Sequence, residues 1–503
     1  MGFSSPRLSF LACLGPWFHV LNMIVAEGVT EGSHTNYFEL YYQQTLDHFQ
    51  PLPRNRWPHR YLINNASWDG RGRLVNGCRG PLLLYAGNEG PIESFWAGNG
   101  FMIEQLAPAW GALLVFPEQR FYGKSLPFGN ASLTDSKNLA YLTTSQVLED
   151  YVELLAHLKA TLPEASTCPV VAFGGSYGGT LAALLRVSYP ATIAGALAAS
   201  SELGYYDVNK WKKHGVTEFT FEDVVIDDYT QAQPGCLEAI QGVISEIEST
   251  AEQEIVDIFH ACDARSLGPQ KSSLFVYALE NLPQLDYPYA IGAMPAKPVS
   301  FACSLLLNAT RNPQGRRRAL LEAASMITGL VIGRQGTSCI PYQGQGGLGN
   351  TPGDGPGPGA WGWQSCTETL HCFSARALRN YTFDLAASTA QCAALYGHGV
   401  RPDIAALAQR YGGFALADGS AGVSRLIWSH GTLDPWHGWF RNVAQPSASS
   451  DVHHFLMEGA AHHLDLRGPH PEDPPAVVHA RQREAEIIHR WIIEAASNPV
   501  VLV

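Results

Sequence analysis

The stretch Gly174-Gly175-Ser176-Tyr177-Gly178-Gly179 decides the fold of this chain. It follows a continuous apolar run at residues 169–173 and precedes a run with helical periodicity at 180–189. This order predicts a strand, a sharp turn centred on Ser176 and a helix, because small residues on both sides leave room for a strained turn. Such a turn exposes the serine hydroxyl at the end of a sheet. The alternative is a glycine-rich turn with an incidental serine, so the chain must also supply partners for that hydroxyl.

The length and composition are those of a large, well-packed globular protein. At 503 residues the chain exceeds one ordinary core, so two domains or one domain with a large insertion are expected. Hydrophobic residues make up 46% of the chain and charged residues 16%, which excludes a disordered protein. The formal net charge of −12 argues against nucleic acids and anionic membranes as partners. Protonation of the 18 histidines would cancel much of this charge at about pH 5, which is compatible with an acidic compartment.

The N-terminus has the features of a secretory signal peptide, with a membrane anchor as the alternative. Arg7 precedes a broken apolar run at 8–25, and small residues follow from Ala26. Later stretches fall short of the roughly 20 apolar residues that span a bilayer, so we expect no membrane anchor in the mature protein. Sequons for N-glycosylation, which fit secretion, begin at four asparagines: Asn65, Asn130, Asn308 and Asn380.

The cysteines also fit an oxidising compartment. The chain has 10 of them, and Cys13 would leave with the signal peptide. Because none has the paired C-x-x-C spacing of a zinc site, disulfides are predicted, and neither a metal nor a cofactor is expected. The odd number of mature cysteines leaves at least one free thiol.

The first part of the chain alternates strand and helix patterns after aromatic-rich β-structure at about 36–75. Continuous apolar runs predict parallel strands buried on both faces of a sheet, at residues 81–85, 112–116, 169–173 and 195–199. Helical periodicity separates them, at 101–107, 145–162 and 180–189. Strands that alternate with helices imply right-handed crossovers and a doubly wound sheet.

The alternation stops after about residue 203. Residues 216–333 are mainly helical in pattern, a Gly/Pro-rich loop covers 343–360, and strand character returns at 425–428 before a last helix at 475–496. With the turn at Ser176, this order predicts an α/β-hydrolase fold that is split by a helical, disulfide-bearing insertion domain. The predicted parts are a signal peptide (1–26), the first part of the hydrolase domain (27–203), the insertion (204–409) and the second part of the hydrolase domain (410–503).

The acid and the histidine of such a fold follow the serine in chain order, each on a loop after a late strand. Asp434 follows the strand pattern at 425–428, and a pair of histidines, His462 and His463, follows the next apolar run. The predicted triad is Ser176, Asp434 and His462, in which the histidine takes the serine's proton and the acid holds the imidazole's tautomer. Spacing alone leaves His462 and His463 both open. The alternatives are that Asp434 is only a turn residue and that His462 is a buried structural histidine.

The oxyanion hole of this fold needs two backbone N–H groups. One comes from the residue after the nucleophile, hence Tyr177, and the other from a loop after an earlier strand. Residues 86–90, which include Asn88, follow the strand pattern at 81–85 and are the candidate loop, with an ordinary glycine turn as the alternative. Glu89 in this loop is a candidate for binding the amino group of a substrate.

Taken together, these motifs resemble the proline-specific serine exopeptidases that include lysosomal prolylcarboxypeptidase and dipeptidyl peptidase 2. The resemblance covers most of the mature chain. It rests on several segments that together are far more specific than any one: Gln43 to Phe49, Gly87 to Gly90, Arg120 to Pro127, the Ser176 turn, Asp286 to Tyr289, Leu433 to Trp436 and Gly459 to Arg467. It implies an enzyme that cleaves after proline or, more loosely, alanine, and it places the catalytic histidine at the first of the pair, His462.

The resemblance also implies that the helical insertion domain caps the active site, and it implies a substrate-binding residue and disulfides. Trp436, beside the catalytic acid, looks like the aromatic that covers a proline ring, with core packing as the alternative. The family's disulfides map onto Cys236–Cys303, Cys262–Cys339 and Cys366–Cys392. Cys78 and Cys168 each lie just before one of two strands that are neighbours in this fold, so they are predicted to pair, which leaves Cys372 as the odd cysteine.

Within this family the tail from His470 to Trp491 looks more like dipeptidyl peptidase 2. The main prediction is therefore release of N-terminal dipeptides after Pro or Ala at acidic pH, and the alternative is a prolylcarboxypeptidase that removes a C-terminal residue after Pro. More distant alternatives are an esterase or lipase, or an inactive binding protein of the same fold. Gln119, Pro91 and Thr180 depart from the family's usual histidine, acid and methionine, which puts the specificity of the pocket in doubt.

The expected partners are peptides with Pro or Ala near a terminus, and a homodimer is compatible with the sequence. The signal peptide and sequons predict entry into the secretory pathway, followed by the lysosome, another acidic vesicle or secretion.

Overall fold

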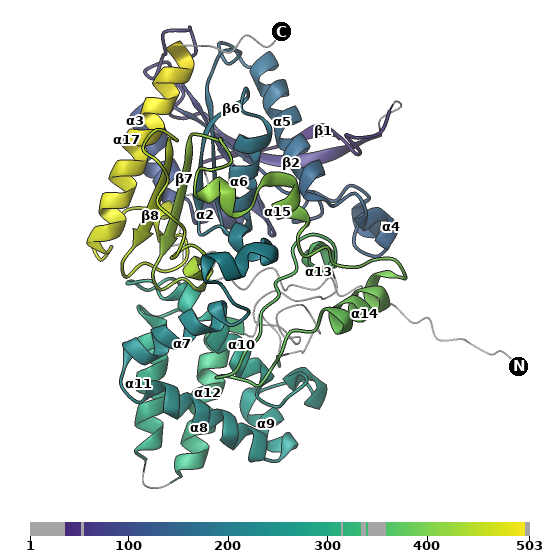
Figure 1. Cartoon of the computed structure of the whole chain (residues 1–503), viewed down its shortest axis with the longest axis vertical. Helices are drawn as coiled ribbons and strands as arrows, with labels where there is room; N and C mark the ends of the chain where they lie inside the picture. Colours follow the sequence, from purple (N-terminus) through teal and green to yellow (C-terminus); the bar gives the residue numbers. More distant parts are fainter. Residues whose placement is uncertain (1–35, 52–54, 313–314, 333–338, 341–358, 498–503) are drawn as a thin grey trace, which may run out of the picture.

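The computed structural model describes residues 36–51, 55–312, 315–332, 339–340 and 359–497 (Figure 1). The predicted signal peptide lies outside the described residues, and so does the Gly/Pro-rich loop except for its last two residues. Figure 1 shows a sheet with helices on both sides in the upper part of the molecule and a group of helices below it.

The described residues form an eight-stranded sheet in the order β1-β2-β4-β3-β5-β6-β7-β8. β2 is antiparallel to β1 and β4, and the remaining neighbours are parallel. The strands are β1 Phe38–Thr45, β2 Arg56–Asn64, β3 Leu82–Tyr85, β4 Leu113–Pro117, β5 Val170–Gly175, β6 Ile193–Ala199, β7 Leu426–Gly431 and β8 Val452–Met457. This order, with the serine turn directly after β5, confirms the predicted α/β-hydrolase fold.

The predicted helices are present with small shifts at their ends, except that the helix predicted at 101–107 is a π-helix at Phe101–Leu106 that continues into α3. The principal helices are α2 Ile92–Ala97, α3 Ala107–Trp110, α4 Ser136–Leu139, α5 Thr144–Thr161, α6 Tyr177–Ser188, α7 Thr220–Ala232, α8 Cys236–Ser249, α9 Glu252–Phe259, α10 Ser273–Asn281, α11 Pro298–Thr310, α12 Arg316–Ile332, α13 Gly359–Ser365, α14 Leu385–Tyr396, α15 Ala406–Tyr411, α16 Phe414–Ala417 and α17 Pro475–Ser497. Within the described ranges, none of them has the length and apolar character that crossing a membrane requires.

Two hydrophobic layers hold the sheet between its helices. On one face, Leu83 and Phe173 pack with residues of α2, α3 and α17. On the other face, Leu84 and Val170 belong to the core that includes α5 and α6. The central strands are buried on both faces, and this is why their sequences are continuous apolar runs rather than alternating ones.

The last helix, α17, packs very closely on strand β6 of the sheet. Trp491 of α17 is fully buried over Gly195 of β6, and a Cβ atom at Gly195 would lie 2.2 Å from the Trp491 ring. Any side chain at this position would therefore push the helix away from the strand. The glycine in the middle of β6 is explained by this packing.

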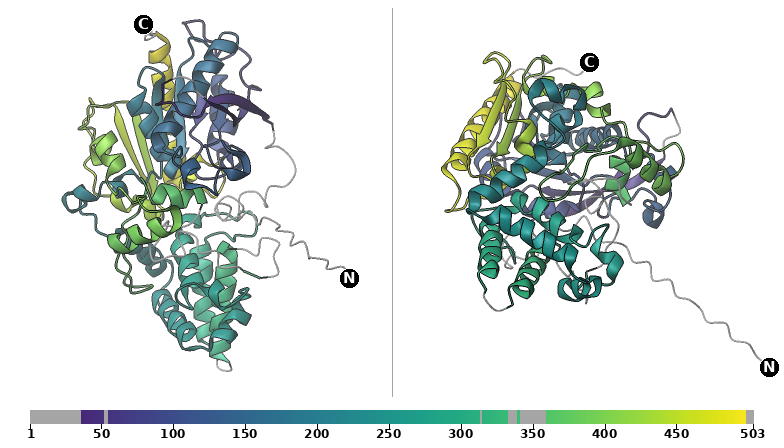
Figure 2. Two further views of the ribbon diagram at one scale, coloured as in Figure 1. Left: turned by 90° about the vertical axis from the view of Figure 1, so that its right-hand side faces the viewer. Right: turned by 60° about the horizontal axis from the view of Figure 1, so that its bottom comes forward.

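A region of helices lies between β6 and β7 in the sequence and projects from one end of the sheet (Figure 2). Its helices α7 to α12 pack mainly on one another. Three disulfides lie within this region: Cys236–Cys303, Cys262–Cys339 and Cys366–Cys392. These are the pairs that the resemblance implied. The domain boundaries 27–203, 204–409 and 410–503 remain predictions.

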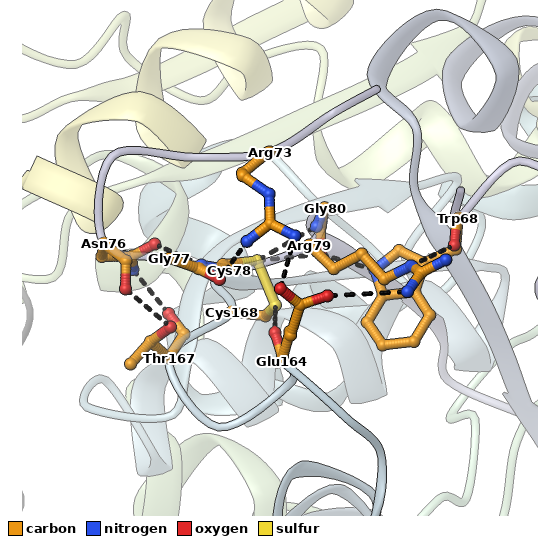
Figure 3. The surroundings of a disulfide bond; sticks show 10 residues. All are labelled: Trp68, Arg73, Asn76, Gly77, Cys78, Arg79, Gly80, Glu164, Thr167 and Cys168. Carbon is orange, nitrogen blue, oxygen red and sulfur yellow. Dashed lines mark hydrogen bonds and ion pairs between the residues drawn. A yellow bond between two sulfur atoms is a disulfide. The ribbon is translucent and has the colours of Figure 1, made fainter. Parts of the chain in front are cut away.

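The fourth disulfide among the described residues, Cys78–Cys168, joins the segments that enter β3 and β5 (Figure 3). The two strands are parallel neighbours, with Leu82 opposite Val170, so the cysteines before them meet at one end of the sheet with a Cα–Cα distance of 4.9 Å. Around them, Arg73 and Arg79 both approach Glu164. The structure thus contains the pair predicted from strand adjacency. Cys372 is the free cysteine of the described residues, and it is buried.

Replacing both Cys78 and Cys168 by serine is expected to lower the free energy of unfolding by about 2–4 kcal/mol, because the bond closes a long loop that the unfolded chain would otherwise leave open. Thermal unfolding of the double variant against the wild type measures this effect. Cys372→Ser serves as the control, since it removes a cysteine but no bond. A double variant as stable as the control would contradict the prediction.

Candidate active site

Ser176 sits in a strained turn that only its glycine neighbours allow. It is the last residue before α6, with φ 61° and ψ −131°, and its N–H donates to Ala199 O at 3.0 Å. A Cβ atom at Gly174 would lie 1.9 Å from the carbonyl oxygen of Gly178. The serine side chain keeps partial exposure while the residues around it are buried. The turn therefore presents the hydroxyl at the carboxyl end of the sheet, at an energetic cost that the surrounding contacts offset.

Asp434 and His462 form a buried, hydrogen-bonded pair at the same end of the sheet. Asp434 follows β7 and His462 follows β8, and His462 Nδ1 lies 2.9 Å from Asp434 Oδ2. Both side chains are fully buried. Burial alone would raise the pKa of Asp434, but the charge and hydrogen bond of His462 hold it below its ordinary value. The other ring nitrogen of His462, Nε2, has no hydrogen-bond partner among the described residues.

Contacts from the helical region fix the loop that carries His462. The N–H of His462 donates to Gln284 O at 3.2 Å, and the hydroxyl of Tyr287 donates to His462 O at 3.1 Å. His463 is held differently, since its N–H donates to Ser200 Oγ at 2.8 Å and its ring lies against Gly175. The geometry therefore brings His462, and not His463, to Asp434.

The loop after β3 lies against the serine turn, as expected of an oxyanion loop. A Cβ atom at Gly178 would lie 2.9 Å from both Ala86 O and Asn88 Oδ1. Asn88 Nδ2 lies 3.4 Å from Gly175 O and donates to Glu89 Oε2 at 2.9 Å. Asn88 and the backbone of Tyr177 are therefore close together, while Glu89 stays a candidate whose contact with a substrate is a prediction.

Trp436 is part of an aromatic cluster beside the acid. It is 2% exposed, and its Nε1 donates to Gln284 Oε1 at 3.0 Å. Its ring centre lies 4.9 Å from that of Phe221 and 5.0 Å from that of His371. Core packing accounts for most of its surface, so its role in holding a proline ring stays a prediction.

The sequence patterns do not predict one residue that lies beside Ser176. Ser176 Oγ donates a hydrogen bond to Glu202 Oε1 at 3.1 Å. Glu202 follows β6, the neighbour of β5, and the rule that functional groups gather at the carboxyl ends of parallel strands could have pointed to it. No motif marks it in the sequence.

The four predicted glycosylation sites all carry exposed asparagines: Asn65, Asn130, Asn308 and Asn380. Their modification remains a prediction. In the part of the chain that the structure describes, no group of three or more His, Cys, Asp or Glu side chains is placed to hold a metal ion.

Comparison with known proteins identifies the family. The profile described as serine carboxypeptidase S28 matches residues 44–484. The chain belongs to the S28 family of serine carboxypeptidases. The lysosomal Pro-X carboxypeptidase of Homo sapiens is 33% identical to this S28 chain over 477 residues, which cover 91% of this chain and 88% of the relative. The same enzyme of Mus musculus is 32% identical over 480 residues, with 92% and 90% covered.

Among solved structures, an esterase of Pyrobaculum calidifontis covers 95% of this chain and 91% of its own, at 9% identity and a TM-score of 0.37. A similarity this low carries no argument about function. Membership of the S28 family makes the chain a serine exopeptidase. Its similarity to Pro-X carboxypeptidases favours the carboxypeptidase alternative over the dipeptidyl peptidase prediction. These relatives are lysosomal by name, and the disulfides suit the secretory pathway.

Alanine at Ser176 or at His462 is expected to lower kcat by roughly 10⁴-fold or more, and Asp434→Asn by about 10⁴-fold, because each breaks the unit of nucleophile, base and orienting acid. His463→Ala should lower it far less, since that ring does not contact Asp434. Steady-state kinetics on a peptide ending in Pro-Phe, with circular dichroism to verify folding, provides the measurement. Equal losses for His462→Ala and His463→Ala would refute the assignment of the base.

Asp228→Asn is expected to stabilise this protein at neutral pH but not at acidic pH. Asp228 lies on α7, and burial, followed by the charges of Asp286 and Asp434, raises its pKa to about 9. The folded protein therefore keeps a proton that the unfolded chain loses above about pH 4, so stability falls as the pH rises from about 4 to about 9. The amide removes this loss.

Unfolding of Asp228→Asn in denaturant should show a gain of about 1–3 kcal/mol over the wild type at about pH 7.5 and little change at about pH 4.5. The exposed neighbour Asp227 provides the control, since Asp227→Asn should change stability little at either pH. A gain of the same size at both pH values would mean that Asp228 is ionised in the folded protein.

Proposed function

We propose that this chain is a serine carboxypeptidase that removes the C-terminal residue of a peptide, with Ser176, Asp434 and His462 as its triad. The observation that carries the proposal is the similarity to Pro-X carboxypeptidases, which extends over more than nine tenths of the chain rather than over one motif. The buried hydrogen bond between Asp434 and His462 supports it, because an acid fixed on Nδ1 leaves Nε2 as the base.

In this mechanism Ser176 attacks the carbonyl carbon before the last residue, and His462 Nε2 takes the hydroxyl proton. Asp434 keeps the imidazole in the correct tautomer and stabilises its cation. The N–H of Tyr177 and the loop of Asn88 stabilise the oxyanion of the tetrahedral intermediate. His462 then gives its proton to the leaving amine, and water releases the remaining peptide from Ser176.

A carboxypeptidase also needs a cation or donors for the free carboxylate of its substrate. Arg467 is a cation on the segment that follows His462, and its guanidinium lies 4.2 Å above the ring of Tyr287. Its Nε is buried and has no hydrogen-bond partner among the described residues. We assign to Arg467 the role of binding the substrate carboxylate, since guanidinium and carboxylate groups form paired hydrogen bonds.

The second candidate is a dipeptidyl peptidase, which needs a carboxylate for the substrate's amino group. The Glu202 side chain beside Ser176 favours it, and so does the likeness of the tail from His470 to Trp491 to dipeptidyl peptidase 2. Glu89 is the other carboxylate of this kind. For either activity, we propose that the enzyme works on Pro- or Ala-containing peptides in the lysosome, in another acidic vesicle or after secretion, and that it can form a homodimer.

The two polarities are separated by one assay at about pH 5. N-acetyl-Ala-Pro-Phe should release Phe, and fluorogenic amides of Lys-Pro or Lys-Ala should be cleaved slowly or not at all. Amidation of the C-terminus of N-acetyl-Ala-Pro-Phe should lower kcat/KM about tenfold or more, because a charged partner for Arg467 is lost. Arg467→Leu should abolish this difference between free and amidated peptide.

The control is Ser176→Ala, which should release nothing from any substrate. Rapid cleavage of the fluorogenic amides, with the acetylated peptide untouched, would replace the proposed function by the dipeptidyl peptidase candidate. If neither kind of substrate is cleaved, both the carboxypeptidase and the dipeptidyl peptidase assignments are contradicted.

A further inference from the structure

A cluster of polar side chains lies on one side of the nucleophile, at the carboxyl end of β6. Its members are Thr180, Ser201, Glu202, Tyr206 and His371, and all five are buried. Thr180 Oγ1 and Ser201 Oγ lie 2.8 Å apart. The cluster borders the aromatic side chains that include Trp436, since the ring centres of His371 and Trp436 are 5.0 Å apart.

Glu202 is the centre of this cluster. Its carboxylate is 1% exposed. One oxygen, Oε2, accepts a hydrogen bond from the hydroxyl of Tyr206 and lies 3.3 Å from His371 Nε2. The other oxygen, Oε1, accepts the hydrogen bond of Ser176 at 3.1 Å. Protein groups therefore hold Oε2 in place, while Oε1 faces the nucleophile.

The strand order places Glu202 opposite the oxyanion loop. The loop of Asn88 follows β3, which pairs with β5 on one side, and Glu202 follows β6, which pairs with β5 on the other. If the carbonyl oxygen of a substrate points to the Asn88 loop and its leaving nitrogen to His462, which protonates it, the attacked residue, P1, is left with the side of Glu202 and the aromatic rings next to it.

Catalysis removes the hydrogen bond on which Oε1 depends. Ser176 must turn its hydroxyl toward His462 Nε2, which has no partner among the described residues. When it does so, Oε1 of Glu202 is left buried without a donor. A buried charged acceptor that loses its donor carries a substantial energetic penalty, so a substrate that supplies a donor at this place is favoured over one that does not.

We propose that Glu202 is a specificity-determining residue that binds a cationic nitrogen of the P1 residue. This inference rests on the proposed serine peptidase reaction at Ser176. Two sources supply such a nitrogen: the side chain of lysine or arginine, or the free α-amino group when P1 is the first residue of the substrate. A proline ring within a peptide has no N–H to offer, so N-acetyl-Ala-Pro-Phe should still release Phe, as the proposed function expects, but with a lower kcat/KM than a peptide with a cationic P1.

Peptides that differ only at P1 test the proposal, with release of Phe measured as kcat/KM. For the side chain, N-acetyl-Ala-Lys-Phe is compared with its norleucine counterpart, which has the same length without the charge. For the α-amino group, norleucyl-Phe is compared with its N-acetylated form. We expect the cationic member of at least one pair to be cleaved about ten- to hundredfold better, as for other charge-assisted hydrogen bonds.

Glu202→Gln should bring that preference down to less than about threefold, because the amide keeps the shape and loses the charge. Glu202→Asp provides a second variant if the amide fails to fold, and it should reduce the preference as well. Glu238→Gln is the matched control at an exposed glutamate of α8 and should leave the preference as in the wild type. The wild-type comparison needs no variant at all.

A preference below about twofold in both wild-type pairs overturns the proposal, and so does a preference that persists in Glu202→Gln. Fluorogenic amides of Ala-Lys and Ala-norleucine separate this result from the proposed function. If they are cleaved while no peptide releases Phe, the carboxypeptidase assignment fails, and the lysine-to-norleucine ratio of the amides still decides the role of Glu202.

Discussion

The strained backbone conformation of Ser176 is the constraint on which the candidate active site depends. A non-glycine residue at φ 61° persists only because β5 and α6 are both fixed, the strand by its parallel neighbours and the helix by the core that it covers. The neighbouring glycines let three segments approach within contact distance: the start of α6, the loop after β3 and the loop of His463. These approaches bring the serine turn together with the loop of Asn88 and with His463.

The sheet alone does not complete this arrangement. The acid and the histidine come from β7 and β8, which return to the sheet after the whole helical region. The histidine loop is then held from that region, by Gln284 O and the hydroxyl of Tyr287. The Asp286 to Tyr289 segment, which carried part of the family resemblance, therefore lies where the helical region meets the loop of His462.

Much of the fold was predictable because local sequence patterns specify it. Continuous apolar runs gave β3, β4, β5 and β6, the glycines around Ser176 gave the turn, and the adjacency of two strands gave the pair Cys78 and Cys168. The order of the acid and histidine followed from the fold class. The distinction between His462 and His463 needed the resemblance, since two adjacent histidines look alike until a partner is placed beside one of them.

The rest of the site was hidden because its contacts are distant in the sequence. Glu202 lies beside Ser176 because β5 and β6 are paired, and His371 reaches Glu202 from the segment between α13 and α14. One sign of this site is visible in the sequence, because Thr180 stands where the family usually has methionine. The sequence could not show that the departure belongs to a polar cluster, because the other members lie in two distant segments, one at 201–206 and one at His371.

The disulfides are divided between the two parts of the molecule. The described bonds lie either in the sheet part or within the helical region, and none of the four ties one to the other. The two parts are thus joined by the chain and by non-covalent contacts, among them those that hold the histidine. A molecule whose helical region is not docked therefore lacks the contacts of Gln284 and Tyr287 that hold the loop of His462.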